Sequence, residues 1–513
     1  MKTLIKGGTR VTCDEVRRAD FLIEGEKIIG VFDAAEADVT GTGDLLCKDG
    51  KCQAHPCEDT ALHEHPGAEG VHPGVPGEAF RPGGDTAVID ASGKYIFPGA
   101  VDIHTHMDLD VGIARVIDDF YTGTVAAACG GTTTIVDHMA FGPKGCALRH
   151  QSDEYHRLAD GKAAVDYGFH GVFQHVNDAV LDEMPLLARE EGITSFKVYM
   201  TYDYMINDFD MMKILARAAE ENILIASHCE NDGIVRYWRE RFVREGKTAA
   251  RYHPVSRPAE AEAEAVHRFL SLARAAGEAP VYIVHLSSEA GLREVLRAKE
   301  TGQKHFGVET CTQYLLLGDS MYEDDQEGLK AIMAPPLRKE ADRAALWKAL
   351  SDNVLDTVAT DHCPFTFSRQ KQQGADDFTK CPSGAPGVEE RLTLLYSEGV
   401  CKGRITLPQL IKYACTNPAR AAGLYPQKGT VSTGSDADLV IFDPDREHVL
   451  SIDRMHGAGD YTCYEGMRVR GSVEQVFLRG RSIVKDGNFT GKRGYGNYLK
   501  RGTSMITDDG LPA

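Results

Sequence analysis

The sequence has little of what marks secreted, membrane-spanning or nucleic-acid-binding proteins. Its first residues, MKTLIKGGTR, contain no apolar run of signal-peptide length. No segment approaches the roughly 18 apolar residues that a membrane span needs. Lysine and arginine total 57 against 76 acidic residues, which gives a net charge of -19, and no long basic run occurs. This balance disfavours nucleic acid and membranes, anionic ones above all, as partners.

The cysteines also lack the pattern of a disulfide framework. They number 13, which is odd, and several lie in strand-like segments such as SHCE and ETCTQ. That pattern is typical of reduced, buried thiols rather than of the paired cysteines of secreted domains. Together with the missing signal peptide, it leads us to expect a cytoplasmic protein.

Both ends of the chain predict β-structure. The 513 residues suit one large domain with a smaller partner. Apolar residues interrupted by glycine turns occur in TLIKGGTRVT and ADFLIEGEKIIGVF at the start, and in DADLVIFDP and SVEQVFLRGRSIVKDG near the end. We therefore predict one β-sandwich domain built from residues 1–97 and 426–490, followed by a C-terminal tail, 491–513.

The middle of the chain, residues 98–425, alternates short apolar runs with segments of helical periodicity such as MMKILARAAEEN and AEAEAVHRFLSLARAAG. Eight strands in alternation with helices predict a (β/α)8 barrel, the TIM-barrel fold. The predicted strands are 99–106, 130–139, 165–173, 193–200, 223–230, 281–288, 304–312 and 354–364.

Residues 47–86 fit neither pattern. The segment is rich in glycine, proline, histidine and cysteine, and it is predicted to be a long loop inserted in the β domain. Its side chains are of the types that bind soft metals, but their spacing matches no standard site, so a surface loop is the favoured interpretation. The residues concerned are Cys47, Cys52, Cys57, His55, His63, His65 and His72.

Potential metal ligands stand where predicted strands end, which is where a barrel carries its chemistry. A lone histidine there is more often a hydrogen-bonded core residue, and we interpret His138 and His175 in this way. His104 and His106 differ, because the period of two along a strand puts both imidazoles on one face. Burying them is costly unless a cation or hydrogen bonds satisfy them. The other candidates are Lys197, His228, His285 and Asp361.

Lys197 lies in FKVYM, in the most apolar part of the predicted barrel. A buried lysine must find an acidic partner or lose its charge. Two interpretations stay open: stabilisation by an acid alone, or addition of carbon dioxide to the neutral amine. The second gives an anionic carbamate able to bridge two cations roughly 3.5–4 Å apart.

Several motifs resemble those of the cyclic amidohydrolases, specifically the dihydropyrimidinase and hydantoinase branch. They are PGAVDIHTH, SFKVYMTYD, SHCEND, YIVHLSS and ATDHCPF, supported by GTTTIVDHM, ETCTQYLLL, APPLR and CPSGAPGVEER. The resemblance runs nearly end to end, apart from residues 47–86. It is greatest to bacterial phenylhydantoinases, through DVGIAR, AAACGGTTTIVDHM and GPKGCALRHQ.

The resemblance implies two divalent metal ions, usually zinc, bridged by a carbamylated lysine (N6-carboxylysine). One ion would be held by His104, His106, Lys197 and Asp361, and the other by Lys197, His228 and His285. It also implies that a hydroxide between the ions attacks the ring. Asp361 would take the proton of this hydroxide and pass it to the leaving nitrogen.

The resemblance extends to substrate contacts. Tyr202 matches the tyrosine that stabilises the developing oxyanion, although a phenol at such a place is otherwise commonly a packing residue. Leu109 and Val111 match the loop that shapes the pocket for the substrate's side chain. Ala334 and Ser383 stand where the family often has serine and asparagine. Because those contacts run mostly through backbone groups, binding is expected to survive the differences.

The resemblance thus predicts hydrolysis of the cyclic amide bond of a hydantoin or dihydropyrimidine, a small neutral cyclic ureide, to an N-carbamoyl amino acid. A dihydroorotase is disfavoured, because Asp108 stands where such enzymes carry an arginine for the substrate's carboxylate. An allantoinase-like hydrolase of another cyclic ureide is the alternative, and Tyr202 weighs against it. A non-enzymatic scaffold of the same fold would lack several metal ligands, whereas all six are present. Family members commonly form tetramers or dimers, so we expect a homo-oligomer.

Overall fold

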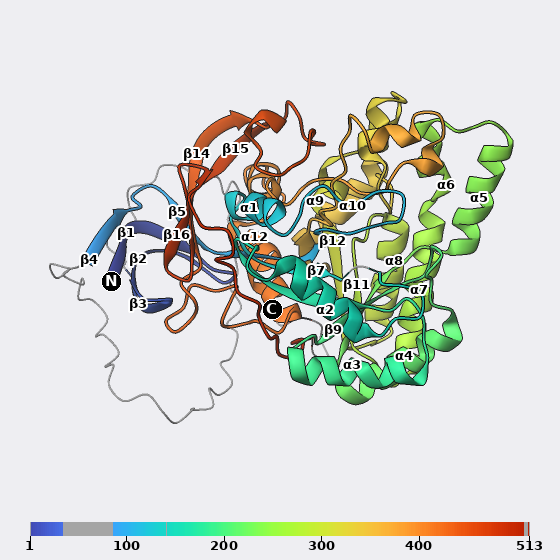
Figure 1. Ribbon diagram of the computed structural model, residues 1–513. Coiled ribbons are helices and arrows are strands. Elements are labelled where there is room, and N and C mark those ends of the chain that lie inside the picture. The colour runs from blue at the N-terminus through green and yellow to red at the C-terminus, as the bar shows by residue number, and fades with distance from the viewer. Residues whose placement is uncertain (1, 34–85, 140, 507–510, 512–513) are drawn as a thin grey trace.

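The computed structural model describes residues 2–33, 86–139, 141–506 and 511 (Figure 1). The predicted insertion 47–86, with all its cysteines and histidines, lies outside the described residues except for Thr86. Two sheets dominate the structure: one of eight parallel strands and one of nine mostly antiparallel strands.

Each of the eight predicted barrel strands contains one strand of the structure. They are β6 (Ala100–Thr105), β7 (Thr132–His138), β8 (Asp166–Val172), β9 (Ser195–Tyr199), β10 (Leu224–His228), β11 (Val281–Ile283), β12 (Phe306–Cys311) and β13 (Thr357–Ala359). Neighbours in this order pair side by side from β6 to β13. A parallel bridge between Thr105 and His362 joins the two outer strands, so the sheet is a nearly closed barrel. The predicted (β/α)8 barrel is confirmed.

Helices alternate with these strands and cover the outside of the barrel (Figure 1). They are α1 (Thr122–Cys129), α2 (Leu148–Ala159), α3 (Asp178–Glu191), α4 (Asp208–Glu221), α5 (Asp232–Arg244), α6 (His253–Ser256), α7 (Ala259–Ala275), α8 (Glu289–Glu300), α9 (Thr312–Leu316), α10 (Glu340–Ser351), α11 (Arg391–Leu394), α12 (Leu407–Ile411) and α13 (Asn417–Ala421). Asn177, Asn207 and Asn231 cap α3, α4 and α5 by accepting a backbone N–H of the first turn. Across the described ranges, no helix has the length and apolarity to span a membrane.

The second sheet is built from both ends of the chain. Its strands are β1 (Lys2–Val11), β2 (Val16–Glu24), β3 (Lys27–Asp33), β4 (Thr86–Asp90) and β5 (Tyr95–Pro98), then β14 (Leu439–Val449), β15 (Arg468–Leu478), β16 (Arg481–Lys485) and β17 (Asn488–Phe489). The two halves meet where β5 pairs antiparallel with β14, and β4 pairs in parallel with β1. One apolar core unites them, with Ile5 and Phe21 from one half and Leu439 and Phe477 from the other. The expected β domain from both chain ends is confirmed.

The segment after β17 lies along the barrel. Tyr167 on β8 donates its backbone N–H to Asn497 O at 3.0 Å and accepts from the N–H of Leu499 at 2.7 Å. The buried guanidinium of Arg501 donates to Phe169 O at 2.6 Å. These contacts anchor the predicted tail on the strands of its own chain.

A buried lysine ties the β domain to the barrel. Lys428 Nζ lies 2.6 Å from a carboxylate oxygen of Asp166 on β8, 3.0 Å from Asp436 and 2.8 Å from Asp438. Burial alone would lower the pKa of Lys428, but these carboxylates raise it above its ordinary value. The lysine is therefore charged and balances a cluster of buried acids.

Replacing Lys428 with methionine would remove the cation that contacts all three acids, leaving Arg479 beside Asp166 and Lys27 beside Asp436. Breaking a buried ion pair from one side costs about 3–5 kcal/mol, so we expect K428M to lower the melting temperature clearly. Lys27 is the matched control, because it contacts Asp436 at 2.7 Å but its side chain is 48% exposed. K27M should cost about 1 kcal/mol or less. Equal shifts in the two variants would contradict this account.

Candidate active site

A cavity of about 1390 Å³ lies where the barrel strands end. Its lining includes every residue that the sequence predicts for the site, namely His104, His106, Leu109, Val111, Lys197, Tyr202, His228, His285, Ala334, Asp361 and Ser383. These residues come from segments far apart in the chain, and the barrel brings them to one mouth.

The first half of the site joins the ends of β6, β9 and β13. Asp361 Oδ1 lies 3.1 Å from His104 Nε2 and 2.9 Å from His106 Nε2. Lys197 Nζ lies 3.5 Å from His104 Nε2. Burial lowers the pKa of Lys197 to about 8, against the influence of Asp361 and Glu309, so more of its amine is neutral than in an exposed lysine.

The second half joins β10 and β11. The rings of His228 and His285 have centroids 4.6 Å apart, and that of His285 lies 5.4 Å from the ring of His104. Burial lowers the pKa of His228, and burial together with the neighbouring His228 and Lys197 holds the pKa of His285 well below its ordinary value. Both imidazoles are therefore neutral at pH 7, which is the form that binds metals.

Three site residues have a left-handed backbone. The φ angle is 74° at Tyr202, 42° at His285 and 53° at Asp361. Such conformations cost non-glycine residues on the order of 1–3 kcal/mol and cluster at functional sites. His285 and Asp361 each lie two residues beyond the end of a strand. The strain thus falls where the chain leaves the barrel and lines the cavity.

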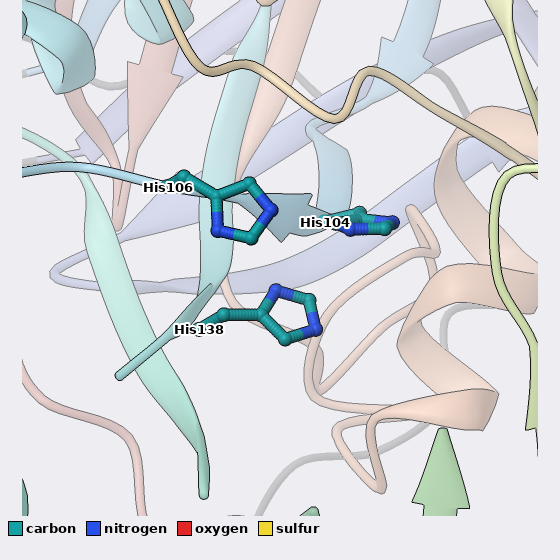
Figure 2. Close-up of side chains that lie close together, drawn as sticks. All are labelled: His104, His106 and His138. Atoms are coloured by element: carbon teal, nitrogen blue, oxygen red, sulfur yellow. The ribbon is translucent and has the colours of Figure 1, made fainter. Parts of the chain in front are cut away.

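The donor atoms of the site fit a cation. Among the described residues, His106 Nδ1, His138 Nε2 and His285 Nδ1 are buried without a hydrogen-bond partner. An unsatisfied buried polar group costs about 1–3 kcal/mol. The imidazoles of His104, His106 and His138 offer ligand atoms within 4.8 Å of one another (Figure 2). Because imidazole and carboxylate are ligands of divalent metals, this site fits metal binding.

His138 is buried and hydrogen-bonded as we predict, and it also lies among the rings of the site. Its Nδ1 has only a long contact of 3.4 Å with Thr105 O. Its ring stacks between those of His106 and His170, with centroid distances of 5.0 Å and 4.5 Å. The structure therefore places His138 beside the predicted ligands His104 and His106, although neither His138 nor His175 lines the cavity.

Two buried glutamates that sequence reasoning missed hold the histidines. Glu309 on β12 lies 2.6 Å from His104 Nδ1 and accepts the backbone N–H of His285 at 3.1 Å. Glu230 lies 2.7 Å from His228 Nε2. Metal-binding histidines commonly donate their second N–H to a carboxylate in this way. The sequence contained a signal for them, because Glu230 lies in SHCEND and Glu309 in ETCTQYLLL, two motifs that resemble those of the family.

Tyr202 belongs to the same network. Its ring centroid lies 5.3 Å from that of His228, and the guanidinium of Arg257 lies 5.4 Å from the Tyr202 ring. Arg257 forms a buried ion pair with Glu230. Burial raises the pKa of Tyr202 to about 12 even though Arg257 opposes it. The phenol therefore keeps its proton at pH 7 and can donate a hydrogen bond into the cavity.

The predicted substrate contacts give the cavity one apolar wall. Leu109 and Val111 pack with Cys363 and Phe365 in an apolar cluster. The Oγ of Ser383 is shielded and has no hydrogen-bond partner in the part of the chain that the structure describes. Apolar walls with a few polar groups are typical of sites for small organic ligands.

Known proteins resemble the chain in sequence and structure. Residues 95–483 match the model of the amidohydrolase family. The chain is 50% identical over 413 residues to a D-phenylhydantoinase of Escherichia coli O1:K1 / APEC, which covers 80% of this chain and 89% of that protein. A dihydropyrimidinase structure from Brevibacillus agri NCHU1002 has a TM-score of 0.86 and 40% identity, over 98% of this chain and 99% of that one. An L-hydantoinase (dihydropyrimidinase) structure from Arthrobacter aurescens has a TM-score of 0.79 and 27% identity, over 97% of this chain and 99% of that one.

Replacing Glu309 with glutamine keeps the shape of the side chain but removes the charge that faces His104. Loss of the carboxylate partner of a metal-binding histidine typically lowers metal affinity by about 10–100-fold, so we expect E309Q to weaken metal binding by that factor. Competition with a chromophoric chelator measures it, and melting of the metal-free protein checks the fold. Glu300→Gln, at the exposed end of α8, is the control. Unchanged affinity in E309Q would refute the assigned role.

Proposed function

The chain belongs to the amidohydrolase family, and from this premise we propose that it opens a hydantoin or dihydropyrimidine ring to give an N-carbamoyl amino acid. The observation that carries the proposal is the convergence of four histidines, Lys197 and Asp361 on one cavity beside Tyr202. The names of the similar proteins, D-phenylhydantoinase and dihydropyrimidinase, support the class of ring.

The proposed metal centre would hold two divalent cations, zinc by resemblance to the family, with carbamylated Lys197 among the ligands of both. The ligands would be His104, His106, Lys197 and Asp361 for one ion and Lys197, His228 and His285 for the other. Within the described residues, Lys197 Nζ has a histidine nitrogen in reach and forms no ion pair, which supports carbamylation over pairing with an acid. Such cations, when bound, polarise a carbonyl and lower the pKa of water.

The chain's own residues orient the ring and move the proton. The Asp361 carboxylate contacts both H-x-H imidazoles and lines the cavity with them, where it would take a proton from water and deliver it to the departing ring nitrogen. The Tyr202 hydroxyl would donate a hydrogen bond to the carbonyl oxygen as it gains negative charge. Leu109 and Val111 would hold the ring's substituent, while Ala334 and Ser383 contact the neutral ring mainly through backbone groups.

We also propose a cytoplasmic homo-oligomer, a dimer or a tetramer. Tyr237 and Val243 on α5 and Val255 on α6 are exposed apolar side chains, which supports contact with another subunit. The cysteines of the described ranges are all free thiols, which supports a reducing compartment.

The test is hydrolysis of dihydrouracil, phenylhydantoin, allantoin and dihydroorotate by purified protein loaded with zinc, with and without bicarbonate, alongside metal analysis. We expect about two metals per chain and turnover of the first or second ring, because a two-cation site suits a neutral cyclic amide. Turnover of allantoin or dihydroorotate alone would assign the enzyme to a branch of the cyclic amidohydrolases other than the hydantoinase branch. Absence of metal and of all turnover would refute an enzymatic role.

Tyr202→Phe tests the oxyanion role. Removing one preorganised donor to an oxyanion typically lowers kcat by about 100–1000-fold, so we expect a loss of this size with little change in KM. Tyr204→Phe, which removes a neighbouring phenol that also lines the cavity, is the matched control and should stay within a few-fold of the wild type. Metal content must be equal in all three proteins. Similar losses in both variants would assign the effect to packing.

A further inference from the structure

Arginines surround the cavity of the proposed active site, and most of them are neutralised. Six line it, and four form ion pairs: Arg115 with Asp110 at 3.5 Å, Arg157 with Glu154 at 2.8 Å, Arg236 with Asp232 at 2.9 Å, and Arg257 with Glu230. Arg244 is exposed at the end of α5, where water solvates its charge. Arg239 differs from all of these, because it is partly buried and forms no ion pair within the described residues.

The position of Arg239 leaves its guanidinium available to a ligand. It donates one hydrogen bond, from Nη2 to the backbone carbonyl of Thr379 at 3.1 Å. Thr379 lies in the same segment as Ser383, and both line the cavity. A guanidinium has further N–H donors in a planar fork, so this single bond leaves most of them unused.

The charge of Arg239 lacks a full counter-charge. Burial and the nearby guanidinium of Arg257 lower the pKa of Arg239, although Tyr202, Asp377 and Glu230 oppose that shift. A neutral donor would suffice for the hydrogen bond to the backbone carbonyl of Thr379. A structural role therefore does not explain a charged guanidinium at a place where burial disfavours its charge. A partly desolvated guanidinium beside a cavity is suited to a carboxylate, which it can hold through two parallel hydrogen bonds.

The size of the cavity leaves room for such a group. Sites for small molecules commonly enclose about 300–1000 Å³, and this cavity is larger, at about 1390 Å³. A five- or six-membered ring at the metal ligands would fill only a part of it. The remaining volume reaches α5, where Arg239 stands, in addition to the apolar wall at Leu109 and Val111.

We propose that Arg239 binds a carboxylate on the substituent of the cyclic ureide, so that the substrate is a neutral ring with an anionic side chain. This inference rests on the proposed function and specifies its substrate class. The ring-opening chemistry is unchanged, because the charged group lies on the substituent and not on the reacting amide.

The experiment compares matched pairs of hydantoins that carry a carboxymethyl or carboxyethyl group at C5 and the corresponding carboxamides. The carboxamides have nearly the same shape without the charge. For the zinc-loaded wild type we expect kcat/KM to favour the carboxylate of at least one length by about tenfold or more, the size of a charge-assisted hydrogen bond. Calorimetric binding of the same pairs gives this comparison without turnover.

Two variants on α5 test whether Arg239 causes the preference for the carboxylate over the carboxamide. Arg239→Gln keeps an N–H donor for Thr379 O but removes the charge, so the ratio of carboxylate to carboxamide should fall to about one. Arg241→Gln removes the same charge from the same helix, at a residue that pairs with Glu245 at 2.8 Å and does not line the cavity. It should keep the wild-type ratio.

The outcomes separate this inference from the proposed function. Hydrolysis of phenylhydantoin or dihydrouracil without any preference for the carboxylates would overturn the inference and leave the proposed function standing. A preference that survives in R239Q, or that falls equally in R241Q, would also overturn it. If no ring is hydrolysed, the proposed function fails, and equal affinities for the two members of each pair would then overturn the inference independently.

Discussion

The closure of the parallel sheet is the constraint on which the site depends. Thr105 pairs with His362, and the backbone N–H of His106 donates to His362 O at 2.9 Å. This fastens the first strand to the last and sets His106 against Asp361, although the two are 255 positions apart in the chain. In an open sheet with the same strand order, the H-x-H pair and the aspartate would stand at opposite edges. No cation could then contact both.

Closure also buries polar groups, which costs free energy unless they form hydrogen bonds. Other residues of the site supply those hydrogen bonds. The carboxylates of Glu309 and Glu230 take one nitrogen each of His104 and His228, which fixes the rings and leaves their other nitrogens toward the cavity. Glu230 in turn holds Arg257 beside Tyr202. One chain of contacts therefore runs from a proposed metal ligand to the proposed oxyanion donor. A change at Glu230 would disturb both ends, which makes this network a unit rather than a set of separate residues.

The sequence was sufficient to predict the strands and the residues that gather at the cavity, and for the strands and the H-x-H pair the reason is local. A buried parallel strand reads as a short apolar run, and the two histidines of H-x-H share a face whatever the rest of the fold does. The partners of those ligands are not local. Glu309 faces His104 across 205 positions, and Arg239 reads as an ordinary charged residue of an amphipathic helix. His138 was interpreted as core because nothing in its spacing indicates which rings it meets across the barrel.

The proposed catalytic residues and the proposed specificity residues lie on different kinds of element, and this has a physical consequence. The proposed ligands stand at or just beyond strand ends, where strained backbone at His285 and Asp361 persists only because the surrounding barrel over-determines it. Leu109 and Val111 lie on a loop, and Arg239 lies on the surface of α5. A substitution there alters contacts with a substituent without moving a strand. The same chemistry can therefore serve rings with different side chains, and in our proposal the charges that line the outer cavity select among them.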